Sequence, residues 1–389
     1  MTHFAGQAGP EDSPVLHATI GLAEQIRAAG DEIEMGRRIP PSISVAMKEA
    51  GVFGMAMPRA WGGPELDPLM QIRVIEALAM ADGSVGWCAM IGCDSGYITA
   101  FLDQDVARNM YADVFVATGA AATTTGKAQR VPGGYRVSGR FPFVSGCHHC
   151  EWAWLGCAVF ADGAQRFNDR GVPETRQCFL RLSQCEILDT WYTTGLCGTG
   201  SHDLAVRDVF VPEEHTFSFQ GPQLVKRCGP LYAFPFMFIA KGPGTALGIA
   251  RHAIDVLTES AAAKPARRYT LGERVEAPKM LRDDVYIQDA VGRAETLLTS
   301  ARAHAFDVVG DLWASLLDGR QPTDRQIALF TTHWQCHCYR GPLDRLVQSL
   351  PASGGARGRR DSCSISTPGF SSLAHLRSQR RRHSLGPAR

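Results

Sequence analysis

The pattern of hydrophobic residues changes twice along the chain, and this change limits the folds that the sequence can adopt. Residues 12–115 carry apolar side chains at helical spacing, residues 116–225 alternate as strands do, and residues 226–356 return to long helical periods. Residues 357–389 have neither period. We therefore predict an α+β fold in which a central β-barrel or β-sandwich domain separates an N-terminal helical domain from a C-terminal four-helix bundle.

Several short helices are predicted in the N-terminal region. Leu16, Ile20 and Ile26 recur at helical spacing, and a second helix begins near Pro41, a residue that suits the first turn of a helix. Segment 85–100 is nearly apolar, so we expect it in the core.

Longer elements are predicted in the other two regions. Residues 152–160 form an uninterrupted apolar strand. Residues 236–260, 285–317 and 321–339 are predicted as long helices with short connections, which is the pattern of an antiparallel bundle.

The composition is that of an ordinary globular enzyme, with 45% hydrophobic and 20% charged residues and a net charge of +1. So small a charge gives no support to nucleic acid or an anionic membrane as a partner. The first residues lack the basic and apolar parts of a signal peptide, and the 12 cysteines then indicate reduced thiols in the cytoplasm.

Motifs in all three regions resemble one superfamily. Residues 51–58, followed by Trp61-Gly62-Gly63, resemble the N-terminal signature of acyl-CoA dehydrogenases. Residues 133–147 resemble the strand pair that closes over the flavin ring in that fold. Residues 191–201 and then 208–212 are most similar to the two-component, group D, flavin-dependent aromatic monooxygenases built on it. The resemblance spans about residues 15–358 and implies the acyl-CoA dehydrogenase-like fold.

The resemblance implies a flavin site, for which the residue types are suitable. A flavin ring needs a flat apolar slot, which Phe143 and Trp191 can form, and a few short donors, which Ser145, Thr199 and Ser201 can supply. Ser145 takes the position beside the flavin N5 and O4 edge and is the predicted catalytic residue. The predicted cofactor-binding residues are Trp87, Phe143, Ser145, Trp191, Thr199, Ser201 and Arg268. The alternative is that the glycine-rich runs are only turns, and that Arg268 is a solvated helix end.

Two clusters of cysteine and histidine invite a metal interpretation. Residues 147–150 (Cys-His-His-Cys) lack the spacing that tetrahedral sites favour, and neighbours in 336–338 (Cys-His-Cys) diverge on a helix. We therefore expect no metal at either cluster. Within the resemblance, 147–150 follows the flavin strand and is expected to border the substrate cavity.

One departure from the dehydrogenases indicates the chemistry. They carry an acid where the β-domain begins, whereas residues 117–126 contain no Asp or Glu. The resemblance then implies an oxygenase that takes reduced FMN or FAD from a separate NAD(P)H-dependent flavin reductase and hydroxylates a small aromatic or polycyclic substrate, as a homotetramer. An acyl-CoA dehydrogenase-type flavoprotein and a non-catalytic assembly subunit are the alternatives.

The last segment departs from the family. Its members continue with a segment that bears a histidine acting on the substrate proton, whereas residues 357–389 are rich in Arg and Ser with no helical period. A disordered basic tail is one interpretation. We prefer a reading-frame slip after about Ala356, because back-translating residues 374–377 and moving one base permits a His-Thr pair. His375 itself is not the family histidine.

Overall fold

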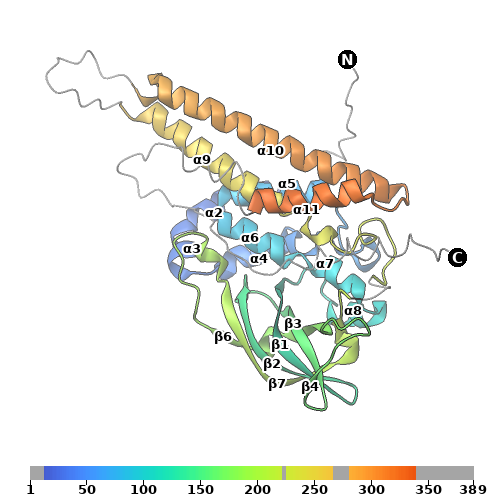
Figure 1. Ribbon diagram of the computed structural model, residues 1–389. Helices are drawn as coiled ribbons and strands as arrows, with labels where there is room; N and C mark the ends of the chain where they lie inside the picture. The colour runs from blue at the N-terminus through green and yellow to red at the C-terminus, as the bar shows by residue number, and fades with distance from the viewer. Residues whose placement is uncertain (1–12, 221–224, 266–279, 339–389) are drawn as a thin grey trace.

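The computed structural model describes residues 13–220, 225–265 and 280–338, without side chains after residue 332. Figure 1 shows three layers: long helices at the top, shorter helices in the middle and a sheet at the bottom. The helices are α1 (Pro14–Gly21), α2 (Ala23–Ala28), α3 (Gly30–Gly36), α4 (Pro41–Glu49), α5 (Pro68–Ala81), α6 (Gly83–Gly92), α7 (Ser95–Ile98), α8 (Gln104–Met110), α9 (Pro243–Ala263), α10 (Val285–Leu317) and α11 (Asp324–Cys338).

The N-terminal layer forms because capping residues divide an apolar sequence into short helices. Asp67 caps α5 by accepting from the Met70 amide, and Asp82 ends α5 and caps α6. Segment 85–100 is in the core, as predicted. The single apolar stripe predicted for the first helix is wrong: Ile20 is 55% exposed, because the chain turns at Leu22 and α2 begins a new period.

The central strands form one sheet with the order β6-β7-β2-β1-β3-β5-β8, and β4 pairs with β3. The predicted α+β order, with a central β-domain between two helical parts, is confirmed, and the strands of the β-domain belong to one sheet. The strand β1 joins its two halves, because it pairs antiparallel with β2 and parallel with β3. The strands are β1 (Thr118–Val131), β2 (Gly134–Val144), β3 (Trp152–Ala161), β4 (Ala164–Gln165), β5 (Thr175–Arg181), β6 (Glu186–Leu188), β7 (His202–Pro212) and β8 (Thr216–Phe217).

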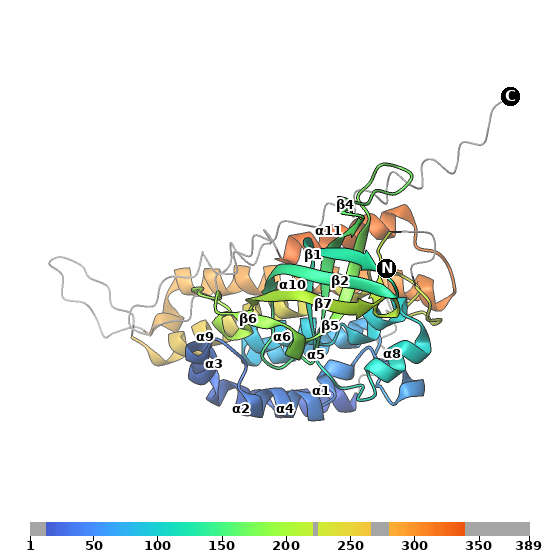
Figure 2. The same ribbon diagram turned by 90° about the horizontal axis from the view of Figure 1, so that it is seen from below.

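The C-terminal layer contains α9, α10 and α11, and Figures 1 and 2 both show α9 beside α10. The first of these helices begins at Pro243 rather than at residue 236, because a proline has no amide hydrogen to donate and suits the first helical position. Arg302 of α10 hydrogen-bonds Glu76 of α5 and so ties this layer to the middle one. The rest of the predicted bundle, after residue 338, lies outside the described residues.

Across the described ranges, no helix is both long and apolar enough to cross a membrane.

Candidate active site

The predicted site residues that lie within the described ranges come together where the end of β2 meets α6. Trp87 of α6 donates from its indole nitrogen to Ser145 Oγ at 2.9 Å. Ser145 Oγ lies 2.7 Å from Ser201 Oγ, which lies 2.7 Å from Thr199 Oγ1. Thr199 donates in turn to the Leu196 carbonyl at 2.9 Å. Arg268 lies outside the described residues.

The backbone at the end of β2 explains why two nearby side chains point in opposite directions. Phe143 has φ of 62°, a left-handed conformation that costs a non-glycine residue roughly 1–2 kcal/mol. The β2–β7 register shifts at the same place. As a result, Phe143 is 50% exposed while Ser145 is only 6% exposed. Strain of this kind is concentrated at functional sites, because the surrounding structure must hold it.

Phe143 and Trp191 do not form the flat slot that we predicted. Their ring centroids are 6.2 Å apart, but the planes meet at 82°. Trp191 is held in this edge-on position because its indole nitrogen donates to the Leu196 carbonyl at 3.1 Å. The two rings therefore make a corner, in which Phe143 is an exposed ring and Trp191 is partly buried.

Thr199 and Ser201 are also placed differently from the free donors that we predicted. Thr199 is 1% exposed and Ser201 is 4% exposed, and both hydroxyls hydrogen-bond inside the protein. Their glycine neighbours allow this close packing: Gly146 and Gly200 both have positive φ, and the Gly146 amide donates to the Thr199 carbonyl at 2.8 Å.

A second set of contacts, which the sequence analysis missed, fixes the segment that carries Trp191. Arg37, at the end of α3, donates to both carboxylate oxygens of Asp189 and to the Trp191 carbonyl. The hydrogen bonds from Arg37 and Tyr192 lower the pKa of Asp189 to about 2. His202 Nδ1 accepts from the backbone amide of Trp191 at 3.3 Å. No local pattern reveals these partners, since Arg37 and Asp189 are 152 residues apart.

The Cys147–Cys150 turn does not gather its side chains around one point. The Cys147 thiol donates to the Gly200 carbonyl, whereas the His148 ring packs edge-on against His202 at 5.1 Å. Among the side chains that the structure describes, no group of three or more His, Cys, Asp or Glu residues is arranged to hold a metal. Residues 336–338 lie beyond the described side chains.

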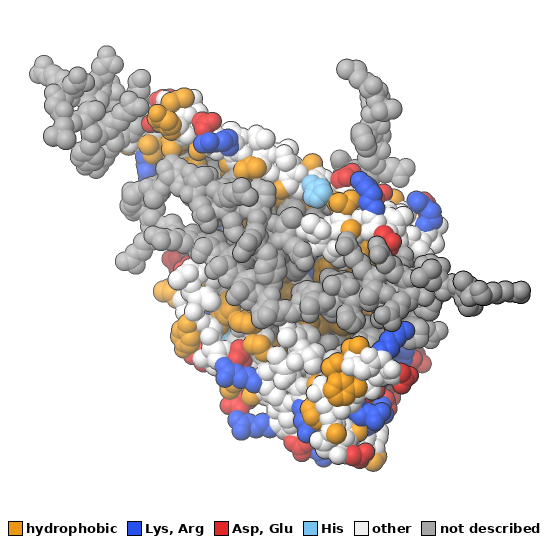
Figure 3. Space-filling view, in the orientation of Figure 1, with side chains coloured by type: hydrophobic (Ala, Val, Ile, Leu, Met, Phe, Trp, Pro, Cys, Tyr) orange, Lys and Arg blue, Asp and Glu red, His pale blue; other side chains and the backbone are white. Residues whose placement is uncertain are grey.

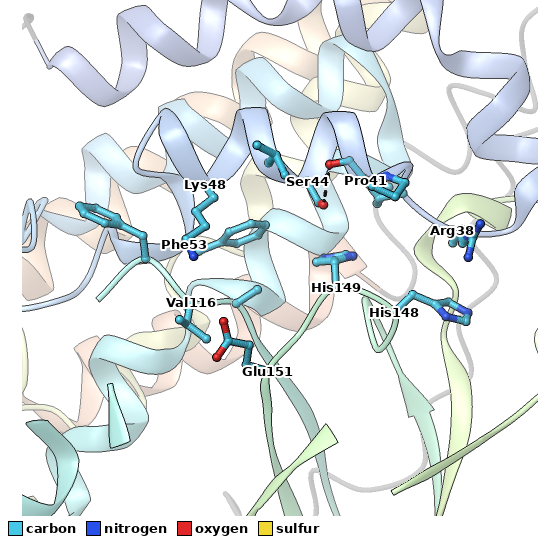
Figure 4. A pocket seen from close by; sticks show the side chains of 13 residues that line it. Arg38, Pro41, Ser44, Lys48, Phe53, Val116, His148, His149 and Glu151 are labelled. Atoms are coloured by element: carbon cyan, nitrogen blue, oxygen red, sulfur yellow. Dashed lines mark hydrogen bonds between the residues drawn. The ribbon is translucent and has the colours of Figure 1, made fainter. Parts of the chain in front are cut away.

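The same turn borders a cavity of about 240 Å³ between α4 and the start of β1. Figure 4 shows His149 beneath α4, between Phe53 and His148. The His149 ring stacks on Phe53 at 5.8 Å, and both of its buried nitrogens lack a hydrogen-bond partner in the described part of the chain. His148 lines this cavity and packs against His202, which accepts from the Trp191 amide.

Replacing His149 with phenylalanine is expected to raise the free energy of unfolding by about 1–2 kcal/mol at pH 7, because it removes unpartnered buried nitrogens and keeps the ring stack. Burial lowers the pKa of His149 from 6.5 to about 4. As the pH falls below 6.5, the unfolded wild-type chain binds a proton at His149 more readily than the folded chain does. The free energy of unfolding of the wild-type protein therefore falls, whereas the variant has no imidazole here and does not lose this contribution.

The advantage of His149→Phe should therefore grow by about 1–2 kcal/mol between pH 7 and pH 5. Urea titrations at the two pH values measure it, and the other histidines cancel because both proteins contain them. An advantage that is absent, or that shrinks at pH 5, would contradict the prediction.

Comparison with known proteins identifies the family. Residues 21–106 match the family model described as acyl-CoA dehydrogenase, N-terminal domain. The chain is 31% identical over 313 residues to the oxygenase subunit HsaA of a flavin-dependent monooxygenase from Rhodococcus jostii, covering 77% of each chain. It is 32% identical to the indole-3-acetate monooxygenase of Pseudomonas putida, covering 75% of this chain and 72% of the relative.

A solved structure supports the fold. The crystal structure of 3-HSA hydroxylase from Rhodococcus sp. RHA1 superposes with a TM-score of 0.77 and 24% identity, covering 97% of this chain and 99% of that one. Likeness at this identity establishes the fold, and the sequence relatives establish the family. The chain belongs to the oxygenase subunits of flavin-dependent monooxygenases, which have the acyl-CoA dehydrogenase fold.

Proposed function

We propose that this chain binds reduced FMN or FAD at the Ser145 site, receives it from a separate NAD(P)H-dependent flavin reductase, and hydroxylates a small aromatic substrate. The observation that carries the proposal is the meeting of a strained, half-exposed Phe143 with the buried Ser145 hydroxyl at the end of β2. When bound, reduced flavin supplies the two electrons with which O2 gives one oxygen atom to the ring and the other to water.

The residues fit a flavin in two respects. The open face of Phe143 offers an apolar wall for a planar ring, and Trp191 closes one side of it edge-on. Ser145 offers a hydroxyl oxygen at the foot of that wall, with its position fixed by Trp87 and Ser201. A dry hydroxyl in this place positions a polar edge of the ring and keeps water from it.

The dehydrogenase alternative has less support. The stretch that carries an acid in acyl-CoA dehydrogenases is here the irregular part of β1, where register is lost between Ala121 and Gly126. The exposed side chains of this bulge are the hydroxyls of Thr123, Thr124 and Thr125. The acid of the dehydrogenase pattern is therefore missing from this stretch, and its exposed side chains are neutral.

One anaerobic experiment distinguishes these functions. The protein is mixed with reduced flavin and an aromatic panel (phenol, resorcinol and indole-3-acetate), and O2 is then admitted. We expect flavin binding and hydroxylated product above the background of free reduced flavin. Reduction of bound oxidised flavin by octanoyl-CoA would favour the dehydrogenase. Absence of binding by any flavin would favour a non-catalytic subunit.

Replacing Ser145 with alanine is expected to lower the product formed per O2 consumed about tenfold, the effect of losing one hydrogen bond of about 1–1.5 kcal/mol. The free energy of unfolding should fall by about 1–3 kcal/mol, because the Trp87 indole loses its acceptor. Ser44→Ala is the matched control, since Ser44 donates only to the Pro41 carbonyl. Product and hydrogen peroxide are measured together. Unchanged coupling in Ser145→Ala would make Ser145 a purely structural residue.

We further propose a homotetramer that assembles through the C-terminal helices. Val285 and Tyr286 at the start of α10 are 64% and 74% exposed, and Leu317 at its end is 58% exposed. Figure 3 shows hydrophobic side chains at the outer end of the α9–α10 pair. Apolar side chains on a long helix favour burial against another subunit. A cytoplasmic location is also proposed, because the cysteines with described side chains are free thiols.

A further inference from the structure

The hydroxyls behind the flavin site form a linear, dry relay. It runs from the Trp87 indole through Ser145, Ser201 and Thr199 to the Leu196 carbonyl, with donor–acceptor distances of 2.7–2.9 Å. The three hydroxyl residues are between 1% and 6% exposed, so solvent does not compete for these hydrogens. The Trp87 nitrogen can only donate and the Leu196 carbonyl can only accept, so the two ends differ in kind.

The Leu196 carbonyl fixes the direction of the hydrogen bonds between the three hydroxyls. A hydroxyl has one hydrogen to donate. Thr199 gives its hydrogen to the Leu196 carbonyl, so Ser201 must donate to Thr199, and Ser145 must then donate to Ser201. Ser145 also receives the Trp87 hydrogen. What remains on Ser145 is one lone pair, so toward the site this hydroxyl can accept a hydrogen bond but cannot give one.

We propose that this relay makes the site selective for reduced flavin, with Thr199 and Ser201 as positioning residues that act through Ser145. The proposal rests on the function proposed above and on the family resemblance, which implies that Ser145 faces the N5 edge of the flavin. Oxidised flavin has a lone pair on N5, whereas reduced flavin carries a hydrogen there. A Ser145 hydroxyl that can only accept therefore forms a hydrogen bond with the N5 hydrogen of reduced flavin. Against oxidised flavin, the Ser145 lone pair would face the N5 lone pair, and this repulsion is costly in a dry site.

Thr199→Val tests the direction of the relay without touching Ser145 or Ser201. Valine removes the hydroxyl to which Ser201 donates, so the Ser201 hydrogen turns to Ser145 and the Ser145 hydrogen becomes free for the flavin. The loop keeps its shape, because the Leu196 carbonyl still accepts from Trp191 Nε1 and the Thr199 amide, both at 3.1 Å.

The measurement is the ratio of two dissociation constants, one for oxidised FMN in air and one for reduced FMN under anaerobic conditions. We expect Thr199→Val to reduce the preference for reduced FMN about tenfold. By linkage, this change raises the relative stability of bound oxidised flavin and lowers the two-electron midpoint potential of bound FMN by about 30 mV. Neither readout depends on turnover.

Two control variants distinguish a change in hydrogen-bond direction within the relay from a general disturbance of the loop. Thr193→Val alters the same loop, but Thr193 donates to the Gly195 carbonyl outside the relay, so the ratio should stay at the wild-type value. Trp87→Phe removes a donor to Ser145 but leaves the Ser145 hydrogen on Ser201, so the preference for reduced FMN should persist. Ser201→Ala should lower the preference as Thr199→Val does.

The outcomes are distinct. A wild-type protein that binds neither form of FMN or FAD would overturn the proposed function itself. If both forms bind but Thr199→Val weakens them equally, or leaves their ratio unchanged, the relay does not set redox selectivity and the inference is overturned. A fall in the ratio in Thr199→Val and Ser201→Ala, with no fall in Thr193→Val, supports it.

Discussion

Replacing Asp94 with alanine is expected to lower the free energy of unfolding by about 3–5 kcal/mol, because the variant leaves the ammonium of Lys241 buried without its counter-charge. The two side chains are 6% and 1% exposed, and Lys241 Nζ donates to Asp94 Oδ1 at 2.5 Å. Lys241 also donates to the Phe238 carbonyl. Burial raises the pKa of Asp94 and the nearby ammonium opposes that rise.

The position of this pair explains why its loss should matter beyond stability. Asp94 follows α6, the helix that carries Trp87, and Lys241 precedes α9 by two residues. The pair therefore joins the end of α6 to the start of the C-terminal helices. We expect the site to loosen together with the junction, since the α6 side chain is the donor that starts the relay.

A double-mutant cycle is the sharpest measurement. Replacing one partner leaves the charge of the other buried without a counter-charge. The double replacement Asp94→Leu with Lys241→Met removes both charges, and such an apolar replacement of a buried pair often leaves the free energy of unfolding nearly unchanged. Urea unfolding should show the double variant to be more stable than Asp94→Leu or Lys241→Met alone. If the losses of the two single variants instead add up to the loss of the double variant, packing and not charge holds this junction. Asp94→Asn provides a milder variant where alanine prevents folding.

The elements that the sequence predicts well are those whose signal is local. Residues 285–317 were expected as one helix and α10 has those bounds, because a 3.6-residue period over 33 residues has few alternatives. The start of α9 was misplaced by seven residues, because the apolar run before Pro243 is buried for reasons of packing and not of helical period.

Long-range pairs leave no such signal. Asp94 and Lys241 are 147 residues apart, and each stands alone in an apolar segment that does not indicate the other residue as its partner. The left-handed conformation of Phe143 is equally hard to predict from the sequence, because phenylalanine rarely has a positive φ, whereas glycine often does. The glycine-rich motifs indicated residues that the structure brings together, and their role at the flavin stays a prediction. The direction of the hydroxyl relay is known only when Leu196 supplies the terminal carbonyl.

A gene corrected by one base after about codon 356 is expected to give about 10²–10⁴-fold more hydroxylated product than the present chain, the range over which loss of a general acid or base acts. Residues 357–389 lie outside the described residues, so the prediction rests on sequence alone: this segment is rich in Arg and Ser and contains no Lys or Glu. Such a composition is typical of a GC-rich gene read out of frame.

The family resemblance implies that the segment restored by the shifted frame carries a histidine that acts on the substrate proton. We expect the present chain to bind reduced flavin but to convert most O2 to hydrogen peroxide, because the sequence of residues 357–389 does not contain that family segment. Product and peroxide per NADH are compared in the two proteins, with a third in which the restored histidine is alanine. That third protein should return to the low rate if the histidine, and not the closing segment, is responsible for the gain. Equal hydroxylation by the present and corrected chains, without excess peroxide, would instead make the arginine-rich segment a working part of this oxygenase.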